Sequence, residues 1–191
     1  MVSHGAENTY RDFRHPKVIN FLDFQTDNPY GPAIRWNRAM SATADIVLFM
    51  DDDVLHNEDL IHEMYQTLIR DVDRNTIYGC VQRGCDSTGY KMRGEGVVLT
   101  PVLMMKKSVL SDYMVHGWPK FESWMREMRG NGEDLSMNIF VHNFYNETSV
   151  FVPPRDRFRY WDKKRGVSYK PGHRSSRVEF CKLYHNTTFE L

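Results

Sequence analysis

The chain has only three cysteines among its 191 residues, Cys80, Cys85 and Cys181. An odd, low count argues against a disulfide scaffold, and no Cys-x-x-Cys spacing is present to hold zinc. Free, partly buried thiols are therefore the simplest expectation, with a Cys80–Cys85 pair as the alternative.

The chain also lacks a long apolar run and an excess of either charge. No stretch reaches the roughly 18–20 apolar residues of a membrane span. The segment from Met1 to Arg14 is polar and unlike a signal peptide, so a soluble, cytoplasmic protein is slightly favoured over a secretory one, unless an upstream segment has been lost. Lys+Arg and Asp+Glu both total 25. We therefore expect no nucleic-acid partner, and any bound anion must be held by a local group of residues.

Apolar strands alternate with amphipathic helices, which predicts one α/β domain over residues 1–191 with a largely parallel sheet flanked by helices. The expected strands are 17–24, 46–50, 77–82, 94–105 and 148–152, and the expected helices are 32–43, 58–70, 106–114, 133–144 and 173–184. Sheets of this kind bind ligands at the carboxyl ends of their strands.

Three aspartates follow the continuous apolar run 46–50, which has the pattern of a strand buried on both faces. Adjacent carboxylates repel one another, and a hard divalent ion such as Mg²⁺ or Mn²⁺ would relieve that repulsion. Side chains alternate along a strand, so Asp51 and Asp53 share a face while Asp52 points away. A solvated acidic turn is the plain alternative.

Two enzyme classes carry such a motif after an apolar strand. One is the metal-dependent glycosyltransferase with its Asp-x-Asp. The other is the haloacid-dehalogenase-like phosphatase, with Asp51 as nucleophile and Asp53 as acid/base. A second acidic motif, 131–138, opens a helix but ends in Asn138, where a phosphatase would need an aspartate. A glycan- or nucleotide-binding module with a degenerate site is the non-enzymatic alternative.

With this second motif in view, the chain resembles the exostosin-type catalytic domain of glycosyltransferase family 64, a GT-A fold that adds hexosamines to heparan-type chains. The resemblance runs in order through five features: Asp51 to Asp53, Arg83 after a short strand, the apolar stretch 98–110, the motif 131–138, and the set His173, Arg177 and Cys181.

The resemblance implies a role for each matching residue. Asp53 would bind Mn²⁺ or Mg²⁺, Asp51 would contact the nucleoside, and Asp52 would belong to the same donor-binding tip. Asn28 and Arg35 would contact uridine, Arg83 and Asp134 would approach the donor sugar, and His173 and Arg177 would face the diphosphate. The expected reaction moves a sugar from a UDP-sugar to a glycan hydroxyl, with retention of configuration. If the enzyme inverts instead, Asp134 becomes the general base.

Two features depart from the family pattern or remain open. Gly132 replaces a family cysteine that can bridge to the late one, so Cys181 is expected to lack a partner, which favours a reducing compartment. The aromatics Trp118 and Trp124 could line an acceptor groove or pack, and the basic, aromatic segment 153–172 is expected to be an ordered loop that closes over donor or acceptor.

Overall fold

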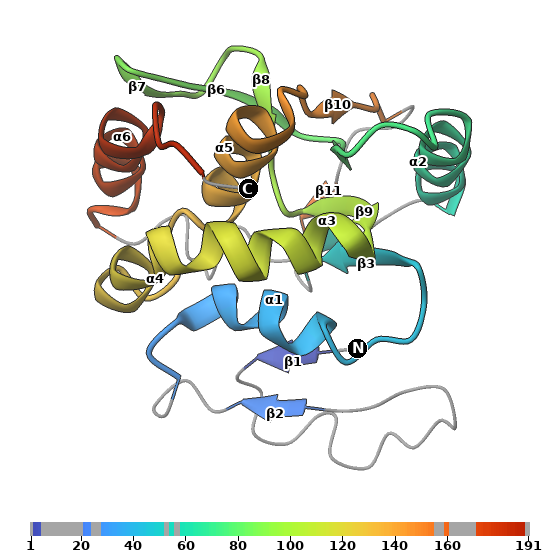
Figure 1. The fold of residues 1–191 in the computed structure, drawn as a ribbon, viewed down its shortest axis with the longest axis horizontal. Helices are drawn as coiled ribbons and strands as arrows, with labels where there is room; N and C mark the ends of the chain where they lie inside the picture. Colours follow the sequence, from blue (N-terminus) through green and yellow to red (C-terminus); the bar gives the residue numbers. More distant parts are fainter. Residues whose placement is uncertain are drawn as a thin grey trace.

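The computed structural model describes residues 28–51, 58–154 and 171–189, and the backbone alone at 2–4, 21–23, 54–55 and 159–160. Helices and strands alternate along them (Figure 1), which confirms the α/β class. The strands are β1 (Val2–His4), β2 (Phe21–Asp23), β3 (Ile46–Met50), β4 (Val54–Leu55), β5 (Ile77–Gly79), β6 (Gln82–Asp86), β7 (Gly89–Lys91), β8 (Gly96–Val98), β9 (Val102–Lys106), β10 (Val150–Phe151) and β11 (Arg159–Tyr160). The helices are α1 (Ile34–Ala39), α2 (Glu58–Arg70), α3 (Lys107–Asp112), α4 (Trp118–Glu127), α5 (Glu133–Tyr145) and α6 (His173–Tyr184).

The central sheet is mixed. Its strand order is β10-β5-β9-β3, in which β10 and β5 are parallel while β9 runs antiparallel to both of its neighbours. The prediction of a largely parallel sheet is therefore wrong for these strands. The chain between β5 and its neighbour β9 contains only the strands β6 to β8 and their turns, without the crossover helix that a parallel connection usually has. The GT-A topology and the single domain over 1–191 stay predictions.

A second sheet, with the order β7-β6-β8, is antiparallel throughout. The second sheet explains why two of the strands expected from the sequence were too long. The segment 77–82 divides into β5 and the start of β6, and the segment 94–105 divides into β8 and β9. An apolar pattern marks an extended segment, but it does not show where the segment changes sheets.

The central sheet separates two apolar cores. Along β9, Leu103 and Met105 face the larger core, while Val102 and Met104 face the smaller one. Helix α2 covers the smaller core with Leu60, Met64 and Leu68, each worth about 1.5–3 kcal/mol when fully buried. Helices α1 and α3 to α6 pack on the other side, and Figure 1 shows α2 and α6 at opposite ends of the molecule.

Strand β3 has the predicted bounds but not the predicted burial. Leu48 and Met50 are 38% and 46% exposed, whereas Val47 and Phe49 are buried. The strand lies at the end of the sheet order, and α2 packs mainly on β5 and β9, with Ile46 at the start of β3 partly buried against the same core. Burial on both faces is therefore a wrong prediction for this strand.

The helices follow the sequence closely where charged residues and glycines mark their ends. Helices α2 and α6 have the expected bounds, but α1 stops at Ala39 instead of Thr43. The helix expected over 106–114 continues through a π-helical turn (Tyr113–Gly117) into α4, which has Pro119 in its first turn. Helix α5 is buried from Glu133 to Val141, so it is a core helix and not an amphipathic one.

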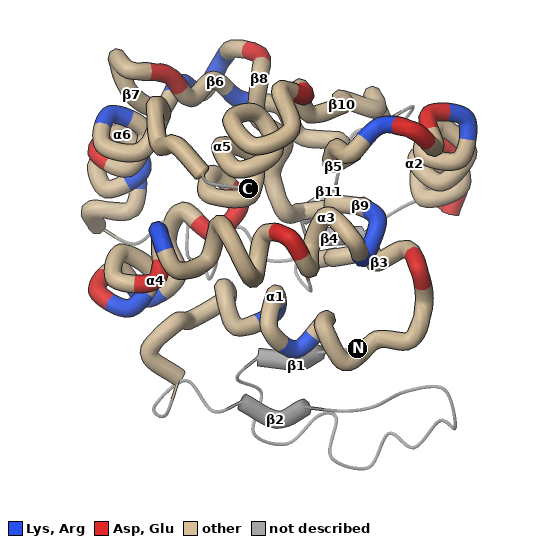
Figure 2. Tube along the Cα trace, viewed as in Figure 1, with Lys and Arg blue, Asp and Glu red and all other residues tan. Residues whose placement is uncertain are grey.

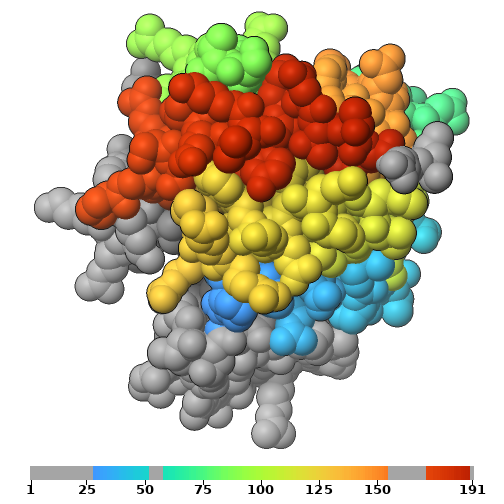
Figure 3. Space-filling model, turned by 60° about the vertical axis from the view of Figure 1, so that its left-hand side comes forward, coloured from blue at the N-terminus to red at the C-terminus, as the bar shows by residue number. Residues whose placement is uncertain are grey.

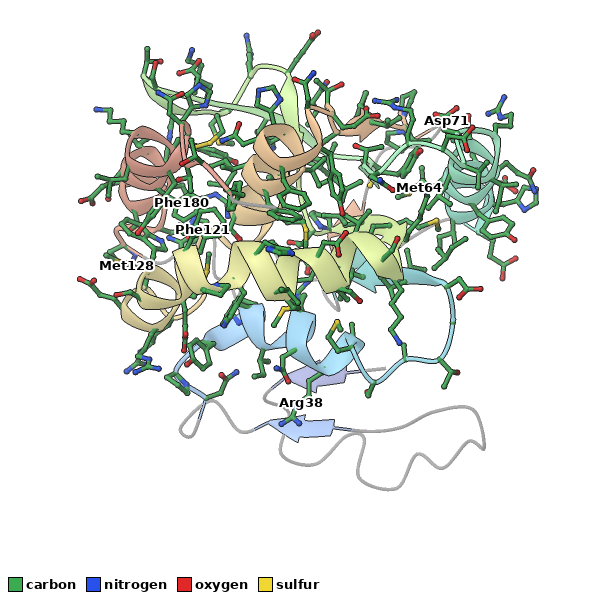
Figure 4. The ribbon with its side chains drawn as sticks, viewed as in Figure 1. Arg38, Met64, Asp71, Phe121, Met128 and Phe180 are labelled. Atoms are coloured by element: carbon green, nitrogen blue, oxygen red, sulfur yellow. A yellow bond between two sulfur atoms is a disulfide. The ribbon has the colours of Figure 1, made fainter. Side chains whose placement is uncertain are left out.

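Aromatic side chains join α4 to α6. The rings of Phe121 and Phe180 lie 5.7 Å apart between centroids, and Figure 4 shows them side by side. Trp124 packs edge-on against Phe180, with 5.4 Å between the ring centroids, and is buried. The structure therefore supports a packing role for Trp124 rather than a place in an acceptor groove. Figure 3 shows α6 lying over α4 on this face of the molecule. This contact fixes the helix that carries Arg177 and His173.

Candidate active site

Burial distinguishes the candidate site from the rest of the described chain. Charged residues of both signs are scattered along the described elements (Figure 2). Among the described residues, however, the charged side chains that are buried are Glu133, Asp134 and Arg177. All three lie where α5 and α6 begin. Buried charges are costly unless they are paired, so their clustering at one place calls for a functional explanation.

Two glycines bring α1 against the start of α5. A Cβ atom on Gly31 would lie 2.0 Å from the carbonyl oxygen of Arg129, and one on Gly130 would lie 2.2 Å from that of Tyr30. Both glycines also have positive φ, at 52° and 82°. Only glycine permits this contact between backbones. The contact places Arg35, on α1, close to the acidic motif at the start of α5.

Arg35 pairs with Asp51, the first aspartate after β3. Its Nη1 donates to Asp51 Oδ1 at 2.9 Å, and both side chains are partly buried. Burial alone would lower the pKa of Arg35, but the charges of Asp51 and Glu133 outweigh burial and raise it. The predicted site residues Asp51 and Arg35 therefore lie together, and they are electrostatically linked to α5.

Asp134 and Arg177 form a buried ion pair between α5 and α6. Arg177 Nη2 donates to Asp134 Oδ1 at 2.5 Å, and the same oxygen accepts the backbone N–H of Leu135 at 2.8 Å. Burial would lower the pKa of Arg177, but Asp134 and Tyr90 outweigh it and raise that pKa. The structure thus brings together two predicted site residues that are 43 positions apart in the chain.

Glu133 is the group in this cluster that titrates near neutrality. Burial, reinforced by the neighbouring charge of Asp134, raises the pKa of Glu133 to about 7. The cations Arg35 and Arg177 oppose that rise. In the sequence, Glu133 is marked only as part of the acidic motif that opens a helix. The sequence does not show that the start of this helix is buried, and that burial is what raises the pKa of Glu133.

Arg83 and Arg177 approach a shared neighbour, Tyr90. The Cζ atom of Arg177 lies 4.9 Å from the centroid of the Tyr90 ring, within the range of a cation–π contact. Burial, the largest effect, raises the pKa of Tyr90, and the positive charges of Arg177 and Arg83 oppose that rise. Arg83 Nη1 donates to the carbonyl of Gln82 at 2.7 Å. No sequence signal indicated Tyr90.

His173 begins α6 one helical turn before Arg177. Its carbonyl accepts a hydrogen bond from Asn131 Nδ2 at 2.9 Å, which joins the start of α6 to the second acidic motif. Burial, and then the charge of Arg177, lower the pKa of His173. The imidazole is therefore neutral at physiological pH and can accept a proton or a hydrogen bond.

Asn28 closes the turn before α1. Its Oδ1 accepts from the backbone N–H of Tyr30 at 3.0 Å, and its Nδ2 donates to the carbonyl of Gly31 at 2.8 Å. Both ends of the amide thus stabilise the turn. The uridine contact expected of Asn28 stays a prediction.

Asp52 and Asp53 lie outside the described residues, and so does most of the segment 153–172. The strand that follows them, β4, pairs antiparallel with β11, with Leu55 opposite Arg159 and Val54 opposite Tyr160. This pairing joins residues 159–160 of the late segment to the strand that follows the aspartates. The closing of the segment over donor or acceptor stays a prediction.

The carboxylate chemistry of the acidic tip suits Mn²⁺ or Mg²⁺. Asp51 is paired with Arg35, and the family resemblance assigns the metal to Asp53, which lies outside the described residues. Within 28–51, 58–154 and 171–189, no three His, Cys, Asp or Glu side chains form a group that could hold a metal. The metal site stays a prediction.

Cys181 has a partner, which corrects the expectation of free thiols. It forms a disulfide with Cys85, with a Cα–Cα distance of 5.4 Å, and Cys80 is the free, buried cysteine. Gly132, at the position of the family cysteine, has φ of 104° and a would-be Cβ 3.3 Å from Phe180. A cysteine at position 132 would be strained, and β6 supplies the bridge instead. The argument for a reducing compartment falls with this correction.

In the part of the chain that the structure describes, no helix has the length and apolarity to cross a membrane.

Comparison with known proteins adds family membership to this geometry. No curated protein matches the chain. The model of the glycosyl transferase family 64 domain matches residues 32–189, a range that includes Arg35, Asp51, Asp134 and Arg177. The match spans α1 to the end of α6 and confirms the resemblance on which the site was predicted. The chain therefore belongs to glycosyl transferase family 64 and is a glycosyltransferase.

Proposed function

We propose that this glycosyltransferase moves a sugar from a UDP-sugar to a hydroxyl of a glycan acceptor and that it requires Mn²⁺ or Mg²⁺. One observation carries the proposal. Both ion pairs, Arg35–Asp51 and Asp134–Arg177, lie near Glu133, as the effect of both arginines on the pKa of Glu133 indicates. Two acidic motifs, far apart in the chain, thus share one site with two cations.

The roles divide between the two sides of this site. On the strand side, Asp51 would face the nucleoside, with Arg35 and Asn28 nearby, and Asp53 would hold the metal. A bound metal ion would neutralise the negative charge that develops on the diphosphate leaving group. The hydrogen bond from Arg35 orients the Asp51 carboxylate, which supports its role as an acceptor for hydroxyl groups of the nucleoside.

On the helix side, Arg177 is the cation for the leaving diphosphate. Its planar guanidinium matches phosphate oxygens, and a buried cation stabilises developing negative charge more strongly than an exposed one. Arg83 approaches the donor sugar from β6, and His173 completes this side as a neutral hydrogen-bonding group. Asp134, held by Arg177, positions the sugar or stabilises positive charge on it.

Retention of configuration fits these residues. Asp134 Oδ1 already accepts two hydrogen bonds, from Arg177 Nη2 and from the backbone N–H of Leu135. Asp134 therefore suits charge stabilisation on one face of the sugar better than removal of a proton from the acceptor. Retention and inversion are distinguished by the anomeric configuration of the first product formed, read by NMR.

Family membership decides between the two enzyme classes that the acidic tip allowed, because the matched family is a transferase and not a phosphatase. The donor sugar and the acceptor glycan remain to be identified by assay. A panel of UDP-sugars, each tested for hydrolysis and for transfer to a mixture of glycan acceptors, would identify both.

A thermal-shift screen of nucleotide sugars with and without Mn²⁺ tests the proposal. We expect UDP-sugars to raise the Tm only when Mn²⁺ is present, and we expect Asp53→Asn to abolish that rise. Asp45→Asn is the matched control, since Asp45 is an exposed aspartate just before the same strand. A Mn²⁺-dependent UDP shift that survives Asp53→Asn would refute the metal assignment. The absence of any shift with every nucleotide sugar would refute the proposed donor.

A further inference from the structure

The hairpin formed by β6 and β7 presents one face to α6. Cys85 on β6 lies directly opposite Tyr90 on β7 in the register of the hairpin. Side chains alternate along a strand, so Arg83, two residues before Cys85, points to the same side. Directly opposed residues of an antiparallel pair also share a side. Arg83, Cys85 and Tyr90 therefore lie on the same face of the hairpin.

A disulfide fastens this face to α6. Cys85 is bonded to Cys181, which follows Arg177 by four residues on the same helix. Residues four apart in a helix lie one above the other on one face. The bond therefore joins the hairpin face that carries Arg83 to the helix face that carries Arg177. Both expected cations of the donor site are held on one cross-linked unit.

Tyr90 fills the space between these two cations. Its side chain is 8% exposed, and its ring lies against the Arg177 guanidinium at 4.9 Å. The positive charge of Arg83 acts on the same phenol. One side chain thus contacts the Arg177 guanidinium through its ring and lies within the electrostatic reach of Arg83.

Arg83 and Arg177 each have a hydrogen-bond donor that no described residue accepts. The Nε atoms of Arg83 and Arg177 are buried and have no partner among the described residues. Buried donors without acceptors are costly, and two cations near the same ring repel one another. An anion with several oxygens would accept hydrogen bonds from the unpaired donors and would also balance the two positive charges. A diphosphate is an anion of this kind.

We propose that Tyr90 is a positioning residue of the donor site, which holds the Arg177 guanidinium in the orientation that receives the diphosphate, with Arg83 beside it on the side of the donor sugar. This inference rests on the proposed function. It goes beyond that function because it assigns the orientation of Arg177 to a residue that needs no contact with the donor. The Cys85–Cys181 bond supports the same arrangement by fixing the hairpin to α6.

The test compares the affinities for UDP and UMP, measured by calorimetry with Mn²⁺. Tyr90→Leu removes the ring from the Arg177 guanidinium, so we expect it to weaken UDP binding about tenfold relative to UMP, the order of a buried cation–π contact. Tyr90→Phe keeps the ring on Arg177 and should recover most of the ratio. Tyr65→Leu, an exposed tyrosine on α2, is the matched control and should leave it unchanged.

Each outcome has a separate meaning. A wild-type protein that binds neither nucleotide refutes the proposed function. If the wild type binds UDP and Tyr90→Leu keeps the same ratio of affinities, the positioning role is wrong. An equal loss of UDP and UMP affinity in Tyr90→Leu also overturns it, because a merely structural role predicts that result. If Tyr90→Leu fails to fold, Tyr90→Met takes its place, because it fills more of the same space without a ring, and the same ratio of affinities decides the proposal.

A different observation concerns two Asn-x-Thr triplets, Asn146-Glu-Thr and Asn186-Thr-Thr. The first follows the end of α5 and the second follows the end of α6. In both triplets the asparagine and the threonine two residues later are exposed. Exposed turns after helices are where N-linked glycans can be accommodated without disturbing a core.

The two triplets lie together at the end of the molecule away from the site. Helices α5 and α6 run in the same direction, because Asn131 joins their starts and Asn143 joins their ends by donating to the carbonyls of His185 and Thr187 at 2.9 Å. Asn146 follows Asp134 by twelve helical steps, roughly 18 Å at 1.5 Å per residue. Glycans at this end would leave the donor site open.

We propose that Asn146 and Asn186 carry N-linked glycans. The Cys85–Cys181 disulfide supports this, because stable disulfides form in the oxidising compartments through which N-glycosylated proteins pass. The test treats peptides of the protein, purified from its own cells, with an N-glycosidase in heavy-oxygen water. Mass spectrometry should find the label at both asparagines and not at Asn143, which has no threonine or serine two residues on. Unlabelled Asn146 and Asn186 in the recovered peptides, or equal labelling of Asn143, would overturn the proposal.

Discussion

Arg177 and Asp134 form the most deeply buried ion pair described in the structure, with Nη2 and Oδ1 at 2.5 Å and side chains 7% and 3% exposed. Removal of two charges from water is expensive, and their attraction repays it only in good geometry. Such a pair adds little to stability compared with apolar residues of the same size. The presence of this ion pair at the start of two helices therefore agrees with a role in ligand binding.

Loss of one partner from this pair should be costly. Arg177→Met leaves the Asp134 carboxylate buried and unpaired, and we expect it to lower the free energy of unfolding by about 3–5 kcal/mol. The double variant Arg177→Met/Asp134→Leu removes both charges and should recover part of that loss. Urea denaturation measures both. Arg126→Met, in the exposed pair with Glu122, should change little. A double variant no more stable than Arg177→Met would show that the carboxylate is not the cause.

Glu133 should make stability fall as the pH rises. Its ordinary pKa is 4.5, and burial raises it to about 7 in the folded protein. Between these two values the folded chain keeps a proton that the unfolded chain has lost, so stability decreases with increasing pH in this window. Glu133→Gln removes the titrating group and should flatten that decrease. Urea unfolding from pH 4.5 to 8 is the measurement, with the exposed Glu179→Gln on α6 as control. Wild-type and Glu133→Gln curves with the same slope would contradict the burial of an ionisable Glu133.

Arg35 should act on that same titration. Its charge is the largest of those that hold the pKa of Glu133 down. Arg35→Gln should therefore move the pKa of Glu133 further upward, and extend the decrease in stability to higher pH. An NMR titration of the glutamate carboxyl carbon would follow the shift directly. Arg38→Gln, the same change one turn later in α1, should leave the titration in place. An unmoved pKa in Arg35→Gln would show that the two acidic motifs do not share a site.

The sequence predicted local structure and motif chemistry but not the long-range contacts. Helix α2, strand β3 and helix α6 were correctly bounded, because acidic first turns, a compact apolar run and a preceding glycine mark such ends locally. The direction of β9 was not predictable, since an apolar strand reads the same in either orientation. The Cys85–Cys181 bond was missed because 96 residues separate the two cysteines and the expected partner position holds Gly132.

The residues of the candidate site also fall into two groups, those marked by a motif in the sequence and those identified only by the fold. Asp51, Asp134, Arg177 and Arg35 were found from motifs, and the structure adds which of them are paired. Glu133 and Tyr90 carry no motif of their own, and their importance follows from burial and from neighbours on other elements. Residues that act by position are found only when the fold that positions them is known.

The approach of α1 to α5 gives a final prediction. Gly31→Ala places a methyl group 2.0 Å from the carbonyl oxygen of Arg129, which is backbone and cannot rotate away. We expect a loss of about 3 kcal/mol or more in the free energy of unfolding, together with weaker nucleotide binding, because α1 carries Arg35. Gly172→Ala is the matched control. It has a similar positive φ of 81° but no atom within 4 Å of the added Cβ, so it should cost only the roughly 1–2 kcal/mol of a left-handed non-glycine residue. Equal losses in the two variants, measured by urea denaturation, would mean that backbone conformation rather than close packing fixes Gly31, and that the contact between α1 and α5 is not what assembles the site.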